Sequence, residues 1–328
     1  MHKLFVIGSN SFSGASFVDF ALGKNAQVIG TSRSAEPVDS LLPYKWRNHQ
    51  NFAFHQLDLN KNLPEMMDLM KSFKPDYVVN FAAQSMVAES WRHPADWFQT
   101  NAVSTVKLHD ELRQCDFMKR YVHISTPEVY GSCSGFVKED FPFNPSTPYA
   151  VSRAAADMSL RTFFAAYHFP VVTTRAANVY GPGQQLYRII PRTILFILLG
   201  KKLQLHGGGH STRSFIHMRD VSEATWRIME GGNNGDTYHI STREIVSIRE
   251  LVERICRKLE VRFEDQVEVV GERLGKDAAY QLDSLKVRSE LNWQDQVSLE
   301  KGLDDCIAWV REHFDVLKNQ PFDYIHKV

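Results

Sequence analysis

Short apolar runs alternate with longer amphipathic segments through the first half of this 328-residue chain. A short apolar run is typical of a strand buried on both faces, and an amphipathic segment is typical of a helix that crosses between parallel strands. The expected strands are Leu4–Ile7, Gln27–Gly30, Phe52–Gln56, Tyr77–Phe81, Tyr121–Ile124 and Val171–Thr174. The expected helices are Gly14–Leu22, Leu63–Phe73, Pro94–Leu112 and Tyr149–His168. This alternation predicts an α/β fold with a doubly wound parallel sheet.

The pattern changes to longer helices and irregular links after residues 179–183. We therefore expect a first domain over residues 1–180 and a smaller, mixed α/β lobe over residues 181–328. Within residues 203–240, the runs Leu203–His206 and Thr237–Ile240 are expected to return strands to the main sheet. The longest apolar run, Ile194–Leu199, is too short to span a bilayer and is expected to pack a helix into the core.

Charge and cysteine content exclude several classes of function. The formal net charge is zero, so no global field attracts nucleic acid or an anionic membrane, and we expect neither as a partner. The four cysteines lie far apart without metal-ligand spacing, which predicts reduced thiols, a cytoplasmic protein and no metal site. The chain passes from Met1 directly into a strand, which leaves no room for a signal peptide.

A glycine-rich turn lies between the first expected strand and the first expected helix. At this place backbone amides and the helix dipole can bind a pyrophosphate. The turn keeps glycine at its two ends and has serine at the middle position. Its expected cofactor contacts are Gly8, Ser11, Phe12 and Gly14.

The next expected strand ends in Ser32-Arg33, in the region that reads the adenosine ribose. An acidic residue there would accept hydrogen bonds from both ribose hydroxyls and repel a 2′-phosphate, whereas Arg33 supplies a cation. The cofactor is therefore expected to be NADP, with NAD as the alternative.

Two short runs carry the chemistry. Residues 125–131 read Ser-Thr-Pro-Glu-Val-Tyr-Gly and follow an expected strand, so they lie where open α/β sheets place ligands. Residues 148–153 open a helix, and the four-residue spacing places Tyr149 and Arg153 on one face. Together with Thr126 and Glu128 they offer a hydroxyl, a carboxylate, a phenol and a permanent cation, which suits redox and proton-transfer chemistry on a polyol.

These runs resemble the active-site segments of extended short-chain dehydrogenases/reductases, specifically the nucleotide-sugar 4,6-dehydratases. The family patterns are Thr-Asp-Glu-x-Tyr-Gly and Tyr-x-x-x-Lys, so Pro127 stands at an acid position and Arg153 at a lysine position. The resemblance implies an NAD(P)-binding Rossmann domain and a nucleotide-sugar-binding lobe. It also implies oxidation at sugar C4, loss of water across C5–C6, and return of the hydride to C6.

The resemblance further implies a role for each residue. Tyr149 is the expected C4 base, helped by the charge of Arg153, while Glu128 is the expected C5 base and Thr126 binds O4. Tyr149 and Arg153 are also expected at the cofactor, with Asp58, Leu59, Ala82 and Ala83. The expected substrate contacts are Gln84, Ser85, Asn178, Arg188 and Arg213.

Three alternatives remain open from the sequence. An NADPH-dependent 4-keto-sugar reductase and a nucleotide-sugar 4-epimerase resemble the same fold. A non-catalytic nucleotide-sensing protein is a third reading.

The segment 272–280 matches the family pattern only in part, so the nucleotide base is not identified. The resemblance also implies a homodimer, formed through the helices expected at Pro94–Leu112 and Tyr149–His168.

Overall fold

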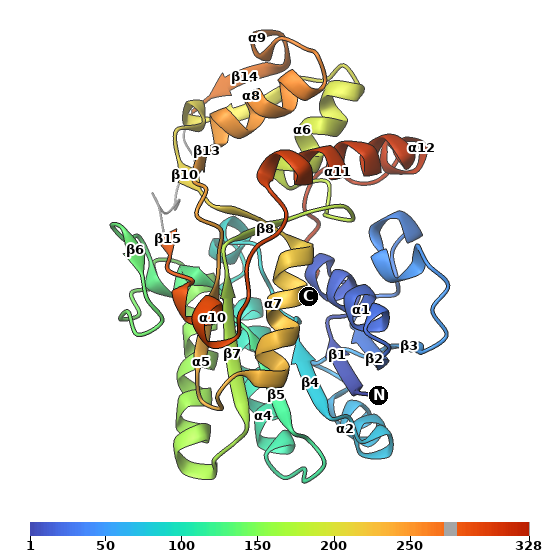
Figure 1. The fold of residues 1–328 in the computed structure, drawn as a ribbon, viewed down its shortest axis with the longest axis vertical. Helices are drawn as coiled ribbons and strands as arrows, with labels where there is room; N and C mark the ends of the chain where they lie inside the picture. Colours follow the sequence, from blue (N-terminus) through green and yellow to red (C-terminus); the bar gives the residue numbers. More distant parts are fainter. Residues whose placement is uncertain (272–280, 328) are drawn as a thin grey trace.

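The computed structural model describes residues 1–271 and 281–327 (Figure 1). A seven-stranded sheet with every neighbouring pair parallel forms the centre of the described chain, in the order β12-β7-β5-β4-β1-β2-β3. Its strands are β1 (Lys3–Ile7), β2 (Gln27–Ser32), β3 (Phe52–Gln56), β4 (Tyr77–Asn80), β5 (Arg120–Ile124), β7 (Val171–Ala176) and β12 (Thr237–Ile240). The order turns around at β1, with β2 on one side and β4 on the other, as in a Rossmann-type doubly wound sheet. This confirms the predicted fold class.

Helices cover both faces of the sheet because the strands are apolar on both sides. In β1, Leu4 and Val6 belong to a core shared with α1 (Phe12–Gly23) and α7 (Met218–Gly231). Phe5 and Ile7 point to the opposite face, where they join a core shared with three helices. These helices are α2 (Leu63–Phe73), α4 (Thr105–Leu112) and α5 (Pro148–Tyr167).

The helix expected over Pro94–Leu112 is present, but its middle section is π-helical. The helix consists of α3 (Pro94–Phe98), the π-helical segment η4 (Gln99–Ser104) and α4. π-Helical sections inside α-helices are rare, and many of those that are known lie at functional sites. Here it buries Asn101 completely.

The smaller lobe has its own apolar core. Its main helices are α6 (Ile189–Leu198), α8 (Ile248–Lys258) and α11 (Leu299–Glu312), and Figure 1 shows them at one end of the molecule with α9 (Phe263–Gln266) and α12 (Phe314–Leu317). Their apolar sides meet in one cluster, which contains Ile194 and Leu195 as expected.

One strand assignment was wrong. The run Leu203–His206 does form a strand, β9, but it pairs with β14 (Val267–Val270) in the smaller lobe and not with the main sheet. Its two buried residues, Leu203 and Leu205, pack against Val252 and Cys256 of α8, so the lobe itself covers its apolar face. Thr237–Ile240 does join the main sheet, as β12 beside β7.

Three further strand pairs and several short helices connect the parts of the described chain. The short strands are β6 (Phe136–Val137), β8 (Asn178–Tyr180), β10 (Thr212–Arg213), β11 (Phe215–His217), β13 (Val246–Ser247) and β15 (Gln281–Leu282). The pair β6–β15 and helix α10 (Leu285–Glu290) lie beside the main sheet. The 3₁₀ segments are η1 (Asp39–Leu41), η2 (Pro43–Lys45), η3 (Ala88–Trp91), η5 (Pro127–Tyr130) and η6 (Gly207–Gly209).

Among the described residues no helix is long and apolar enough to cross a bilayer. Those residues also contain no cluster of three or more His, Cys, Asp or Glu side chains placed to hold a metal ion. None of the four cysteines, all of which lie in the described part of the chain, forms a disulfide bond.

Candidate active site

A cavity of about 960 Å³ lies between the carboxyl ends of the central strands and the smaller lobe. Its wall contains many of the residues predicted from the sequence. They are Ser11, Phe12, Ala83, Ser85, Thr126, Glu128, Tyr149, Arg153, Asn178, Arg188 and Arg213. Residues more than 200 positions apart in the sequence therefore meet at one site, and the volume suits a drug-sized or larger ligand.

The glycine-rich turn has the geometry of an anion site. Gly8 has φ of +79°, and a Cβ there would lie 2.7 Å from the backbone nitrogen of Ala82. Ser11 begins α1: its hydroxyl accepts from the Gly14 amide at 3.1 Å and donates to the Gly8 carbonyl at 2.7 Å. The amides of residues 12 and 13 have no acceptor among the described residues, and both residues line the cavity. The turn therefore fits a pyrophosphate.

The residues expected at the adenosine end lie outside the cavity wall. Nη1 of Arg33 donates to the main-chain carbonyl of Lys327 at 2.9 Å. Asp58 accepts the Asn60 amide at 2.8 Å. The side chain of Leu59 is buried in the core, which leaves only its backbone for a ligand.

The segment after β4 is held by a buried asparagine. Asn101 accepts the backbone amide of Gln84 at 2.8 Å and donates to the Gln84 carbonyl at 2.9 Å. In a third hydrogen bond, the Asn101 side chain donates to the Ser152 hydroxyl of α5 at 3.0 Å. Ala82 is fixed separately, because its backbone amide donates a hydrogen bond to the Asn80 side chain at 2.9 Å. These bonds set the path of the chain beside the cavity.

The four predicted catalytic side chains come together at the carboxyl end of β5 and the start of α5. Thr126 is the N-cap of η5; its hydroxyl accepts the Glu128 amide and donates to the Glu128 carboxylate. The Thr126 side chain also lowers the pKa of the Tyr149 phenol. Thr147 caps α5 by accepting the Ala150 amide at 3.1 Å, which begins the helix just before Tyr149.

The pKa of the Tyr149 phenol shows which effects dominate the site. Burial raises it, and the nearby Glu128 carboxylate raises it further. The cation of Arg153 and the Thr126 side chain lower it, but the net pKa is about 12. The sequence predicted the favourable effect of Arg153, but burial outweighs it in the protein without ligands.

Arg153 is 2% exposed and bonds to β5. Its Nη2 donates to the Ile124 carbonyl and lies 3.4 Å from Nε2 of His123. His123 lies 3.3 Å from the carboxylate of Asp157, which also pairs with Arg175 at 2.7 Å. Burial would raise the pKa of Asp157, but Arg175, His123 and Ser125 lower it far below its ordinary value. The predicted cation thus lies on a buried ionic network.

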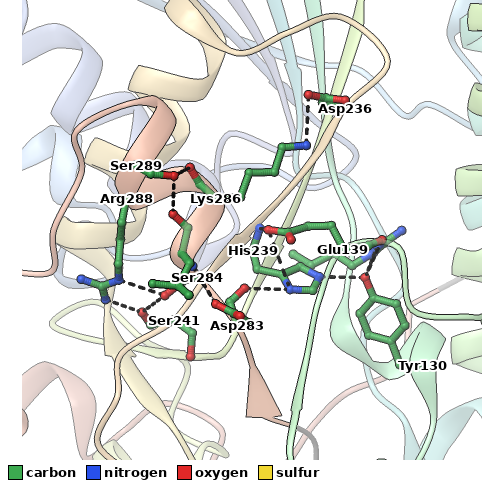
Figure 2. Close-up of polar contacts among 12 residues, drawn as sticks. Tyr130, Glu139, Asp236, His239, Ser241, Asp283, Ser284, Lys286, Arg288 and Ser289 are labelled. Atoms are coloured by element: carbon green, nitrogen blue, oxygen red, sulfur yellow. Dashed lines mark hydrogen bonds and ion pairs between the residues drawn. The ribbon is translucent and has the colours of Figure 1, made fainter.

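This network continues behind the active-site turn (Figure 2). Arg175 donates to the Tyr130 hydroxyl, which lies 2.7 Å from Nε2 of His239 in β12. Nδ1 of His239 lies 3.1 Å from the Asp283 carbonyl, and its amide donates to Glu139 at 3.0 Å. Burial lowers the pKa of His239 to about 3, so its ring is neutral. The turn that carries Glu128 is thereby tied to the edge of the main sheet.

Cations line the lobe side of the cavity. Arg188 precedes α6, where its guanidinium lies 5.4 Å from the ring centroid of Tyr187. Arg213 is in β10 and donates to the Thr212 carbonyl at 2.7 Å. Asn178 begins β8, and its backbone N–H donates to the Ser214 carbonyl at 3.1 Å. Forked donors of this kind suit a diphosphate.

Several residues that shape the site were not predicted from the sequence. Four buried side chains hold the predicted residues in place through hydrogen bonds and ion pairs, and they are Asn101, His123, Asp157 and Arg175. Local sequence carries no signal for such distant contacts. The segment 321–327, which contacts Arg33 and Gln84, was also missed.

Comparison with known proteins identifies the family. The family model described as GDP-mannose 4,6 dehydratase matches residues 5–306. The chain belongs to this family. A dTDP-glucose 4,6-dehydratase of Haemophilus influenzae is 30% identical, over 94% of this chain and 98% of its own. A human dTDP-D-glucose 4,6-dehydratase is 32% identical, over 83% of this chain and 79% of its own.

Solved structures agree with this family. DesIV, a dTDP-glucose 4,6-dehydratase of Streptomyces venezuelae with NAD and TYD bound, is 30% identical with a TM-score of 0.89. The similarity covers 96% of this chain and 98% of DesIV. A UDP-glucose 4-epimerase of Thermotoga maritima with UDP-glucose is 25% identical with a TM-score of 0.84, covering 95% and 99%.

These similarities confirm the predicted family and reaction class: the chain is a nucleotide-sugar 4,6-dehydratase, an enzyme that uses a nicotinamide dinucleotide. The 4-epimerase alternative shares the fold, but the matched family model and the named sequence relatives are dehydratases.

Proposed function

We propose that this enzyme removes water from a nucleotide-diphosphate hexose through the side chains of Thr126, Glu128 and Tyr149. The observation that carries the assignment is the carboxylate of Glu128, which accepts a hydrogen bond from Thr126 and raises the pKa of the nearby Tyr149 phenol in the same cavity. Epimerisation at C4 needs no base for C5. Elimination does, and Glu128 supplies one beside the C4 base.

The residues fit a dinucleotide cofactor. The amides of residues 12 and 13 would hold its pyrophosphate, and Tyr149 and Ala83 would face its nicotinamide half. When bound, the oxidised nicotinamide supplies a hydride acceptor for C4 and later a hydride donor for C6. Its positive charge would add to that of Arg153 in lowering the pKa of Tyr149.

The side chains would then move the protons of O4 and C5. Tyr149 takes the O4 proton as C4 is oxidised, and Thr126 donates to the resulting ketone oxygen. The ketone makes the C5 proton acidic, and Glu128 takes it. Because Pro127 has no proton to give, the protonated Glu128 passes this same proton to the departing C6 hydroxyl, which leaves as water. As the hydride returns to C6, C5 takes up one proton, which balances the O4 proton that Tyr149 releases.

The sugar diphosphate would lie against Arg188 and Arg213, with Asn178 beside them, and the sugar would reach Ser85 and Thr126. The cavity connects these residues, and both arginines are suited to phosphate oxygens.

We propose NAD as the cofactor. The earlier expectation of NADP rested on Arg33, but one nitrogen of that guanidinium is already bonded to Lys327. The solved dehydratase DesIV holds NAD. The ratio of NADP to NAD dissociation constants would test this choice. A ratio below one would overturn it.

We also propose a homodimer formed through η4 and α5. Three apolar side chains, Val103, Val151 and Met158, are 38–56% exposed along these two neighbouring elements. A second copy would cover them by pairing the two helices of each chain. A monomer in sedimentation at micromolar concentration would contradict this proposal.

The function is tested by incubating the purified enzyme with cofactor and a panel of nucleotide sugars. We expect one nucleotide sugar to lose the mass of one water without net consumption of the cofactor. An isomer of unchanged mass would indicate an epimerase, and stoichiometric oxidation of NADPH would indicate a reductase.

A further inference from the structure

The last described segment, residues 321–327, forms neither a helix nor a strand, and its residues alternate in burial. Phe322, Tyr324 and His326 are partly buried, whereas the residues between them are exposed. The rings of Phe322, Tyr324 and His326 pack against the protein. We call this segment the strap.

The strap begins on the smaller lobe. The Phe322 ring packs against Phe196 of α6 with centroids 5.7 Å apart, and its carbonyl accepts from Arg192 at 3.3 Å. Tyr324 then packs edge-on against Tyr187, with centroids 5.6 Å apart. Phe196, Arg192 and Tyr187 all line the active-site cavity, so the strap lies along its border.

The strap ends on the dinucleotide-binding domain. The His326 ring stacks on Trp97 of α3 and on His93, with centroid separations of 5.1 and 4.9 Å. Its Nε2 lies 2.7 Å from the Asp96 carboxylate. The segment therefore links the two lobes and is held at both ends by side chains.

One atom of the strap contacts residues from both sides of the predicted cofactor site. The Lys327 carbonyl accepts from Nη1 of Arg33 at 2.9 Å and from Nε2 of Gln84 at 2.8 Å. Arg33 follows β2 and Gln84 follows β4, and β1 lies between these strands in the sheet. The carbonyl consequently lies across the carboxyl end of β1, where the glycine-rich turn begins.

We propose that the strap is the outer wall of the cofactor site and holds the dinucleotide in place through the catalytic cycle. The inference rests on the proposed function, because a dehydratase must keep its cofactor between taking the hydride and returning it. A chain segment anchored by three rings can close the site and still detach for exchange, since ring contacts and a few hydrogen bonds from side chains hold it and it is not paired with any strand.

The test is the rate at which bound NADH leaves the enzyme, measured by fluorescence after mixing with excess NAD. The variant Phe322→Ala/Tyr324→Ala/His326→Ala should release NADH at least tenfold faster than the natural chain. The variant Ile325→Ala is the matched control, because this side chain is 61% exposed on the outer side of the strap. It should release NADH at the natural rate.

A second measurement uses the unaltered enzyme. Amide hydrogen exchange of residues 321–327 should slow when NADH binds. Faster exchange would show that the strap competes with the cofactor and would overturn the proposal, as would equal release rates in all three proteins. Absence of any NADH binding to the natural chain would instead overturn both the strap and the proposed function.

Discussion

Nη2 of Arg153, in the wall of the active-site cavity, lies 3.4 Å from Nε2 of His123, and both side chains are buried. Burial lowers the pKa of His123, which keeps the imidazole neutral at pH 7. A neutral ring can lie close to a guanidinium without adding a second positive charge. The pair therefore places one cation, and not two, near the phenol of Tyr149.

Changing this cation should move the pH dependence of the reaction. Arg153→Ala removes a charge that lowers the pKa of Tyr149, so the rising limb of the kcat profile should shift by about 1–2 pH units to higher pH. Arg153→Lys keeps a positive charge and should shift it less. Arg161→Ala, an exposed change on the same helix, is the control. Equal profiles for Arg153→Ala and the natural enzyme would exclude this role.

Glu128→Gln should separate oxidation from elimination. The amide cannot take the C5 proton, so exchange of that proton with deuterated solvent and loss of water should fall by about 10²-fold or more. Oxidation at C4, followed by NADH absorbance in a single turnover, should remain. Glu312→Gln, on the exposed end of α11, should change neither step. Elimination at the natural rate in Glu128→Gln would show that another group is the base.

Pro127→Asp should accelerate elimination alone. The new carboxyl group can donate a proton to the departing hydroxyl, a role worth about 10²-fold or more where a positioned acid is missing. Pro127→Asn is the matched control, since its amide has the same shape and no acidic proton. Rapid-quench measurement of water loss checks the prediction. Equal rates in both variants would mean that Glu128 already supplies this proton efficiently.

Asp157→Asn should destabilise the fold. Removing the carboxylate leaves Arg175 buried without its ion-pair partner, which typically costs about 3–5 kcal/mol in the free energy of unfolding. Asp315→Asn, in an exposed pair with Lys318, should change that free energy little. Urea unfolding at pH 7 measures both variants.

The same carboxylate predicts a pH dependence of stability. Its pKa is lowered in the fold, so its stabilising effect is complete above the unfolded pKa of about 4 and is lost as pH falls toward the folded value. The unfolding free energy of the natural chain should therefore fall below about pH 4, with a smaller fall in Asp157→Asn. Parallel curves for the two proteins would contradict this account.

The central sheet could be predicted because its strands and helices differ in local period. β5 and the start of α5 were placed correctly, and with them the cluster of Thr126, Glu128 and Tyr149. β9 could not be assigned to a sheet, since alternation at Leu203 and Leu205 shows that one face is buried but not which element buries it. Local period fixes the type of an element more surely than its partner.

Properties that depend on burial or on distant contacts were beyond sequence reasoning. The charge effect of Arg153 on Tyr149 could be estimated from helical spacing, but the larger effect of desolvation depends on the completed cavity. The contact of Arg33 with Lys327 joins residues 294 positions apart, and nothing in either local sequence indicates it.

The position of β12 at the edge of the main sheet bears on how the protein is made. β7 ends at Ala176, but its neighbour β12 begins only at Thr237, after most of the polypeptide has left the peptidyl-transferase centre. At typical synthesis rates the unpaired edge of β7 waits several seconds for this strand. A nascent chain stalled before residue 237 thus presents an open sheet edge to chaperones, and an isolated fragment 1–180 is a poor choice for expression.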